Sequence, residues 1–167
     1  MPEKQTSELV ENIKTIVIAL LIALVIRSFL FQPFNIPSGS MMPTLLVGDY
    51  LFVSKYSYGY SRHSLPFSPP IFSGRVWESA PRRGDIAVFK LPTDGHTDYI
   101  KRVVGLPGDR VQMREGLLYI NDAIVPQTQI DDFIDRDGNG NAVQTRQYRE
   151  TLPGGVGHNV LDMLISG

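Results

Sequence analysis

The chain has 167 residues, of which 43% are apolar, and it contains 15 glycines, 12 prolines and no cysteine. This length is enough for one domain of ordinary size. Sixteen basic and 17 acidic side chains nearly balance, which argues against a nucleic-acid binder that neutralises phosphates with a basic face. Without cysteine, the chain has no disulfide, no thiolate zinc site and no cysteine nucleophile.

Metal and cofactor chemistry also finds little support. The three histidines, His63, His96 and His158, are far apart in the sequence and form no helix-spaced ligand pair. The polar stretch 135–141 resembles part of a calcium loop, but the position that needs a bidentate glutamate is Arg146. We expect a polar surface turn there, no metal site and no cofactor.

An unbroken apolar run from Ile16 to Ile26 lies between Lys14 and Arg27. This run is too short to cross a bilayer, which takes ~20 residues. If the Arg27 guanidinium reaches the headgroups, the usable stretch extends over 13–34, and at ~1.5 Å per residue it covers about 33 Å. We predict a transmembrane helix over residues 13–32, preceded by a cytoplasmic segment of residues 1–12.

Two alternatives to an anchor are a cleavable signal peptide and a buried core helix. A signal peptide has a positive start and a small-x-small exit, whereas acidic residues outnumber basic ones before this run and Ser28-Phe29-Leu30-Phe31 follows it. Lys4 and Lys14 precede the span, so the charge pattern favours a cytoplasmic N-terminus.

Short apolar segments separated by turn signals follow the run. They predict strands at 50–54, 86–89, 99–104, 110–113 and 117–120, with a long irregular excursion over 56–82. This spacing is typical of an antiparallel β domain. We therefore expect a mainly β chain with a catalytic β core over residues 33–126, followed by a polar insertion or secondary region over 127–167.

The segment 36–45 has two hydroxyls, Ser38 and Ser40, separated by one glycine and held between prolines. A tight loop of this kind can present a serine oxygen beside backbone N–H donors. Serine and glycine are also common in ordinary turns. The pattern alone does not decide between these interpretations.

A serine nucleophile needs a base, and Lys101 stands out in the absence of a histidine partner. In an alternating strand Lys101 and Arg102 point to opposite sides, and both interrupt apolar surface. A guanidinium stays protonated, whereas burial can neutralise a lysine amine. The alternative is a solvated Lys-Arg pair at the edge of a strand.

These pieces, in this order, resemble the bacterial type I signal peptidase (leader peptidase) family, whose members are serine proteases with a Ser/Lys dyad. The resemblance covers about residues 16–126. The matching segments are the end of the apolar run at 25–29, residues 33–45, Gly48-Asp49, and the segments 83–89, 98–109 and 118–121.

The resemblance implies a signal-peptidase/LexA-like β fold and a role for each matching residue. Ser40 corresponds to the nucleophile and Lys101 to the general base, while the Ser40 N–H and the Ser38 hydroxyl form the oxyanion hole. The residues that match positions lining or bordering the substrate pockets are Phe34, Ile36, Pro37, Val88, Tyr99 and Ile100. Such shallow pockets admit small side chains, as in an Ala-x-Ala cleavage site.

The resemblance also implies partners and a location. The partners are signal peptides of exported preproteins and the lipid bilayer, near the secretion translocon. The expected location is the bacterial cytoplasmic (inner) membrane, crossed once, with the catalytic domain on the outer, periplasmic side.

One motif of the family has no counterpart in this chain. Family members carry a C-terminal motif rich in Gly-Asp-Asn-Arg and Asp-Ser-Arg, and nothing comparable occurs before Gly167. We expect from this a truncated peptidase in which Arg102 lacks its acidic partner and the β domain is incomplete at its C-terminal end. An inactive fragment, or an anchored β domain that binds exported peptides without cutting them, is the alternative.

A self-cleaving repressor of the LexA type uses the same dyad on a related fold. It needs a soluble DNA-binding helix-turn-helix ahead of the protease domain, where this chain has an apolar span instead. The sequence therefore favours the peptidase over the repressor.

Overall fold

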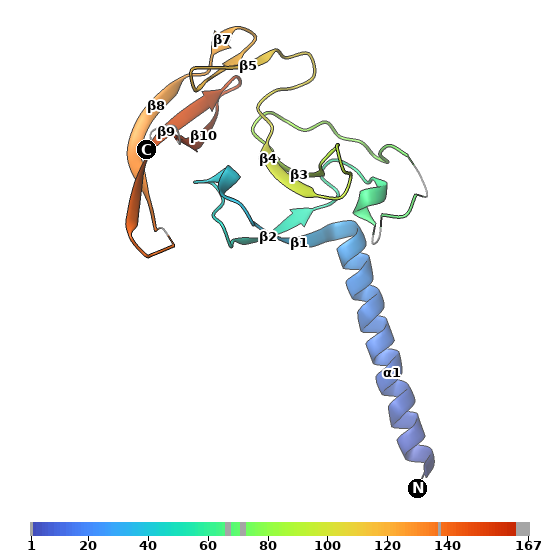
Figure 1. Ribbon diagram of the computed structural model, residues 1–167. Helices are drawn as coiled ribbons and strands as arrows, with labels where there is room; N and C mark the ends of the chain where they lie inside the picture. Colours follow the sequence, from blue (N-terminus) through green and yellow to red (C-terminus); the bar gives the residue numbers. More distant parts are fainter. Residues whose placement is uncertain (1, 66–67, 71–72, 137, 163–167) are drawn as a thin grey trace. The chain divides into compact units, whose positions relative to one another are not determined.

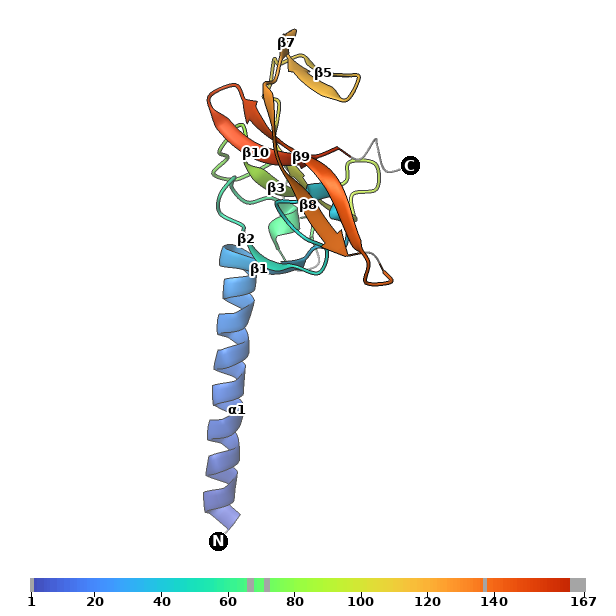
Figure 2. The same cartoon turned by 90° about the vertical axis from the view of Figure 1, so that its left-hand side faces the viewer.

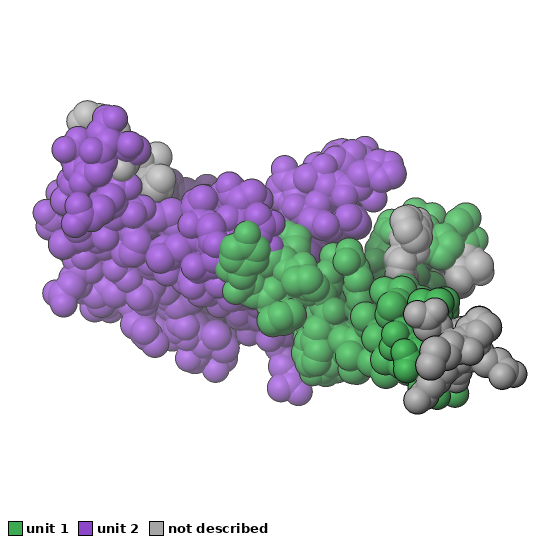
Figure 3. Space-filling model, turned by 90° about the horizontal axis from the view of Figure 1, so that it is seen from below, with its two compact units in different colours: residues 1–34, 50–80 green, residues 35–49, 81–167 purple. Residues whose placement is uncertain are grey.

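The computed structural model describes residues 2–65, 68–70, 73–136 and 138–162. The chain forms two compact units that alternate along the sequence. Unit 1 comprises residues 1–34 and 50–80, and unit 2 comprises residues 35–49 and 81–167 (Figure 3). The Ser38 to Leu45 segment and the Lys101 strand, which the sequence singles out, both belong to unit 2.

Unit 1 begins with a long helix, α1 (Pro2–Val25), which continues as a π-helical turn, η1 (Ile26–Leu30) (Figure 1). Within this helix, Glu8–Leu30 forms a 23-residue stretch with a mean hydropathy of 2.4 that is only 6% buried. A helix that is apolar on all sides and is not covered by protein is typical of a membrane span. An apolar helix in this region is confirmed, although it starts well before residue 13 and its last turn ends at Leu30. That it crosses a membrane stays a prediction.

The helix ends in a turn whose carbonyl groups find partners in unit 1. The Phe31 N–H bonds to Ile26 O, the Lys55 N–H bonds to Leu30 O at 3.0 Å, and the Tyr60 hydroxyl bonds to Phe29 O at 2.8 Å. The last carbonyls of a helix have no intrahelical donor. The segment after β2 therefore supplies donors for this helix end.

The rest of unit 1 is a two-stranded sheet and an irregular excursion. Strand β1 (Phe31–Asn35) pairs with β2 (Tyr50–Ser54). The excursion holds a short 3-10 turn, η3 (Arg62–Ser64), and one isolated bridge between Tyr60 and Val76. The prediction of strand 50–54 is confirmed, and so is the irregular excursion for its described residues.

Unit 2 contains the strands that the sequence predicts between residues 86 and 120. Strand β3 (Ile86–Lys90) pairs antiparallel with β4 (Asp98–Arg102). Strands β5 (Val111–Arg114), β6 (Leu117–Ile120) and β7 (Ala123–Ile124) form a three-stranded antiparallel sheet. Leu118 and Ile120 on β6 pack with Val125 and Leu152 in a small buried core.

Residues 127–161 form a third sheet in unit 2, which the sequence analysis did not predict. Its strands are β8 (Gln127–Arg136), β9 (Ala142–Leu152) and β10 (Val156–Leu161), in the order β10-β9-β8 (Figure 2). The exposed residues 138–141 turn between β8 and β9. The polar turn expected over 135–141 is thus confirmed for these residues, whereas Asp135 and Arg136 belong to the end of β8. The prediction of a mainly antiparallel β chain with an N-terminal apolar helix is confirmed.

Candidate active site

Residues 36–49 form the serine loop, a closed excursion of unit 2 that carries Ser38 and Ser40. The Ile36 N–H bonds to Asp49 O and the Gly48 N–H bonds to Ile36 O, both at 2.9 Å. Ile36 is only 1% exposed. The two ends of the loop are therefore joined at a buried residue, which limits where Ser40 can move.

Ser40 lies in a single 3-10 turn, η2 (Gly39–Met41), within the serine loop. The Met42 N–H bonds to Gly39 O at 3.0 Å and the Thr44 N–H bonds to Met41 O at 2.9 Å. The side chain of Met41 is buried while Ser40 is exposed. The buried Met41 side chain thus anchors the turn, while Ser40 stays accessible to solvent.

Lys101 reaches Ser40 from β4. It pairs with Ala87 of β3 in the antiparallel register, and its Nζ donates a hydrogen bond to Ser40 Oγ. The same Nζ lies 5.6 Å from the centre of the Tyr99 ring. Folding of unit 2 therefore brings together the two residues that the sequence singles out as nucleophile and base.

Ser38 stands beside this pair. Its hydroxyl donates to Ser40 Oγ at 3.5 Å, and both serines are exposed. A hydroxyl at this distance can turn toward an oxygen bound next to Ser40. Ser38, Ser40 and Lys101 thus form one polar cluster.

Arg102 holds the serine loop from the residue next to Lys101. Its Nη2 donates to Thr44 Oγ1 at 3.2 Å and its Nη1 donates to Gly84 O at 2.9 Å. Burial lowers the pKa of the Arg102 guanidinium. Both acceptors are neutral, so Arg102 forms no ion pair with a carboxylate of the described residues.

Gly84, whose carbonyl accepts the hydrogen bond from Arg102, leaves no room for a side chain. Its φ is +92°, and a Cβ at this position would lie 2.4 Å from Val156 Cγ1. Only glycine adopts such a φ without strain. The turn before β3 can therefore approach β10 and still offer its carbonyl to Arg102.

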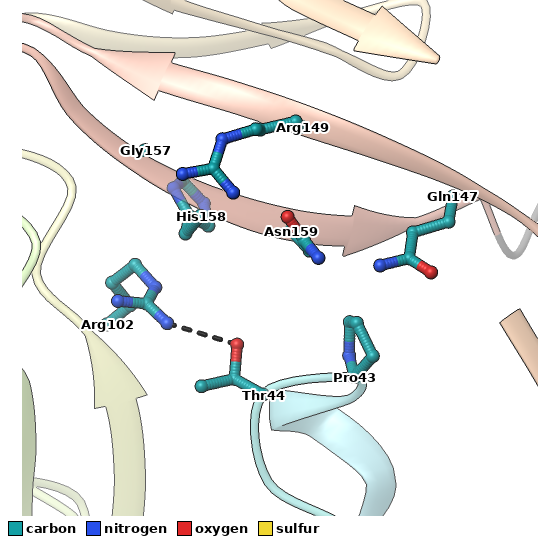
Figure 4. A pocket seen from close by; sticks show the side chains of 8 residues that line it. All are labelled: Pro43, Thr44, Arg102, Gln147, Arg149, Gly157, His158 and Asn159. Carbon is teal, nitrogen blue, oxygen red and sulfur yellow. Dashed lines mark hydrogen bonds between the residues drawn. The ribbon is translucent and has the colours of Figure 1, made fainter. Parts of the chain in front are cut away.

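A cavity of about 390 Å³ lies next to Arg102 (Figure 4). The serine loop contributes Pro43 and Thr44, and β4 contributes Arg102. The other lining residues come from β9 and β10: Gln147, Arg149, Gly157, His158 and Asn159. The cavity is thus on the Arg102 side of the serine loop.

His158, which lines this cavity, forms a buried pair with Glu150. His158 Nε2 lies 3.2 Å from Glu150 Oε2, and both side chains are less than 10% exposed. Burial raises the pKa of the Glu150 carboxyl, but hydrogen bonds from His158 and Gln127 outweigh it, so that the pKa is lowered overall. These residues tie β8, β9 and β10 together by polar contacts.

The residues predicted to border the substrate pockets differ in exposure. In unit 2, Ile36 and Ile100 are buried, Val88 is half-buried, and Pro37 and Tyr99 are exposed. Val88 faces Ile100 in the β3–β4 register, and Phe34 lies half-buried on β1 in unit 1. Their role as substrate-binding residues stays a prediction.

Sequence reasoning missed the contribution of Thr44 and of the Glu150–His158 pair. Thr44 stands inside the motif around Ser40, but a threonine after proline carries no signal for a distant arginine. Within the described ranges, no group of three His, Asp or Glu side chains is arranged to hold a metal ion.

Comparison with known proteins identifies relatives of the chain. The family model described as "Signal peptidase, peptidase S26" matches residues 9–160. The protein named signal peptidase I of Rickettsia typhi is 47% identical over 136 residues, which is 80% of this chain and 50% of that protein. Signal peptidase I of Rickettsia prowazekii has the same identity and coverage, and that of Rickettsia conorii is 46% identical over 136 residues, again 80% of this chain and 50% of the relative.

The chain spans about half the length of the curated relatives it matches. The match includes the serine loop and β4, and hence all the residues of the polar cluster around Ser40.

Proposed function

We propose that this chain, which belongs to the signal peptidase family of peptidase S26, takes part in removing signal peptides from exported preproteins as a membrane-anchored serine endopeptidase. The observation that carries the proposal is the hydrogen bond from Lys101 Nζ to Ser40 Oγ. A nucleophile and a base within hydrogen-bond reach of each other satisfy the first geometric condition for covalent catalysis.

In the proposed acylation step, Ser40 Oγ attacks the carbonyl carbon of the residue before the scissile bond. The hydroxyl proton passes to the neutral amine of Lys101, and the carbonyl oxygen becomes an oxyanion. The Ser40 N–H and the Ser38 hydroxyl would donate to this oxyanion. Protonated Lys101 then gives its proton to the leaving amine, which departs as the new N-terminus of the mature protein.

Deacylation uses the same base. Neutral Lys101 takes a proton from a water molecule, whose oxygen attacks the ester carbonyl, and the proton is returned to Ser40 Oγ when the signal peptide leaves as a carboxylic acid. The hydrogen bond between Lys101 Nζ and Ser40 Oγ supports this role, because it places the base within reach of the oxygen that the reaction regenerates.

The apolar helix supports attachment to a bacterial inner membrane, with Glu8–Leu30 as the span. In our proposal the N-terminus lies in the cytoplasm and unit 2 on the outer side. The substrate-side predictions follow from the resemblance: Pro37, Val88 and Tyr99 would contact the residues before the cleavage point, and their small apolar pocket would favour Ala-x-Ala boundaries.

The test is cleavage of a preprotein with an Ala-x-Ala boundary by the chain reconstituted in vesicles. We expect Ser40→Ala to lower the cleavage rate by about a thousandfold or more, while Ser79→Ala, at another exposed serine, leaves it unchanged. Cleavage that persists in Ser40→Ala contradicts the assignment. Binding of the signal peptide without cleavage by the unsubstituted chain would favour the peptide-binding alternative.

A further inference from the structure

The excursion that follows β2 in unit 1 packs against the end of the apolar helix. Tyr60 donates its hydroxyl to Phe29 O at 2.8 Å, and the rings of Phe29 and Tyr60 are 5.9 Å apart. The Lys55 N–H bonds to Leu30 O at 3.0 Å. Lys55 and Tyr60 are therefore held at the end of the helix.

Trp77 adds a further aromatic ring to the contact between Phe29 and Tyr60. The Tyr60 backbone bridges to Val76, and the Tyr60 and Trp77 rings are 6.0 Å apart in an edge-to-face arrangement. Even so, the Trp77 residue is 81% exposed and Tyr56 is 53% exposed. Tryptophan and tyrosine are the residues enriched where a membrane meets water.

Positive charge accompanies these aromatic rings. In residues 26–34 and 50–80 the basic side chains are Arg27, Lys55, Arg62 and Arg75, and the acidic one is Glu78. None of the four basic side chains forms an ion pair with a described carboxylate. Burial, and in addition the charge of Arg27, lowers the pKa of Lys55.

The two arginines of the excursion keep most of their donors available. Arg75 uses Nη1 for the carbonyls of Tyr58 and Gly59, at 3.2 and 3.5 Å. Arg62 uses Nε toward the ring of His63, at 3.3 Å. Both arginines are exposed, and a guanidinium has five N–H donors, so each can still bind a phosphate.

We propose that Arg62 and Arg75, supported by Arg27 and Lys55, bind the phosphate groups of anionic phospholipids while Trp77 and Tyr60 lie at the membrane surface. The depth follows from the helix, because the Glu8–Leu30 span brings Leu30 to the headgroup region at ~1.5 Å per residue. Basic side chains next to an anionic membrane are attracted to its surface. This headgroup site requires the membrane attachment of the proposed function but not its catalysis.

Trp77 is the single tryptophan of the chain, so its fluorescence reports on this surface. The full chain, with Ser40→Ala to remove any proteolysis, is reconstituted in vesicles of phosphatidylcholine and phosphatidylglycerol. Either lipid carries bromine on its acyl chains, at the same mole fraction. We expect brominated phosphatidylglycerol to quench Trp77 at least about twofold more than brominated phosphatidylcholine, with the difference reduced by added salt.

The double variant Arg62→Gln/Arg75→Gln should bring the two quenching values together. The matched control Arg114→Gln/Arg136→Gln removes two exposed charges from unit 2 and should leave the difference unchanged. Equal quenching by both lipids in the chain with all arginines, or a difference that persists in Arg62→Gln/Arg75→Gln, overturns the headgroup site. If the chain with Ser40 does not cleave the preprotein but the quenching difference is as expected, only the proposed catalysis is contradicted and the headgroup site is supported. If neither lipid quenches Trp77, both the headgroup site and the membrane position assumed for it are contradicted.

Discussion

Arg102 and Thr44 are joined by a hydrogen bond of 3.2 Å between Nη2 and Oγ1. Thr44 belongs to the same loop as Ser40, and Arg102 follows Lys101 on β4. The loop and the strand are thus linked at two adjacent strand positions, once through Lys101 and Ser40 and once through Arg102 and Thr44. We interpret the second link as a brace that keeps Ser40 within reach of Lys101.

Removal of this brace should affect turnover more than substrate binding. Thr44→Val keeps the shape of the side chain but removes the acceptor, so we expect kcat for preprotein cleavage to fall about tenfold with little change in KM. Thr93→Val, at an exposed threonine outside the site, is the control. A Thr44→Val chain with unchanged kcat would show that Arg102 does not position the loop.

The close approach of Gly84 to Val156 predicts a specific stability defect. Gly84 and Gly108 share a φ of +92°, but a Cβ on Gly108 meets no atom within 4 Å, whereas one on Gly84 would lie 2.4 Å from Val156 Cγ1. Gly108→Ala should therefore cost about 1 kcal/mol of strain, and Gly84→Ala about 1 to 3 kcal/mol more. Chemical denaturation of both variants measures the difference.

The double variant Gly84→Ala/Val156→Ala tests whether contact with Val156 causes the extra cost. It should be more stable than the sum of the two single changes predicts. Simple additivity would mean that the approach of the turn to β10 is not the cause.

The ion pair between Arg83 and Asp109 should contribute more to stability than the exposed pair between Arg110 and Asp122. Arg83 Nη2 lies 2.8 Å from Asp109 Oδ2 with both side chains less than 15% exposed, and its Nη1 bonds to Val104 O. Arg83→Met removes the ion pair and the donor to Val104 O, while Asp109 keeps its hydrogen bonds from the Leu106 N–H and the Asn121 amide, and it should destabilise the fold by about 1 to 2 kcal/mol. Arg110→Met, in a pair that is 65% and 53% exposed, should cost about 0 to 1 kcal/mol. Equal losses in urea unfolding would contradict this ranking.

Glu150 predicts a pH dependence of stability. Its pKa in the folded chain is lower than the ordinary value of 4.5 because the hydrogen bonds from His158 and Gln127 outweigh the effect of burial. A depressed carboxyl pKa contributes stability that is complete above the unfolded value and is lost as the pH falls through the folded value. Glu150→Gln should therefore lower the free energy of unfolding by about 1 to 2 kcal/mol at neutral pH.

The same reasoning predicts that this difference narrows once the pH falls below the ordinary value of 4.5 and further through the folded pKa. Urea unfolding of both chains at neutral and acidic pH measures it. Glu115→Gln, at an exposed residue, should have no effect at any pH. A constant difference between Glu150→Gln and the unsubstituted chain from neutral to acidic pH would contradict the role given to the carboxylate.

The strands between residues 86 and 120 were predictable because their apolar residues alternate and glycine-containing turns separate them. Strand β1 was missed because Pro33, which donates no backbone hydrogen bond, signals an interruption. Strands β8 to β10 were missed for another reason. Their inward positions include polar residues such as Gln147 and Glu150, which are buried, so no apolar period marks the sheet.

The candidate site, like the fold, was predictable only in part. The motifs identify Ser40 and Lys101, but an alternating pattern cannot show that Lys101 and Arg102, on opposite sides of one strand, both reach the serine loop. The contacts of Tyr60 and Trp77 with the helix end were equally out of reach, because a long loop leaves no periodic signal. Contacts between residues distant in sequence had to come from the structure.

The most direct measurement of the central claim is the cleavage rate of Lys101→Arg in vesicles. Arginine keeps the positive charge and donors near Ser40 but does not give up its proton to act as a base, so we expect cleavage of the Ala-x-Ala preprotein to fall by about a thousandfold or more. Lys90→Arg, whose lysine pairs with Asp98 away from Ser40, should cleave normally. Cleavage by Lys101→Arg at the unsubstituted rate would contradict the account, because Ser40 would then not need a neutral amine at position 101.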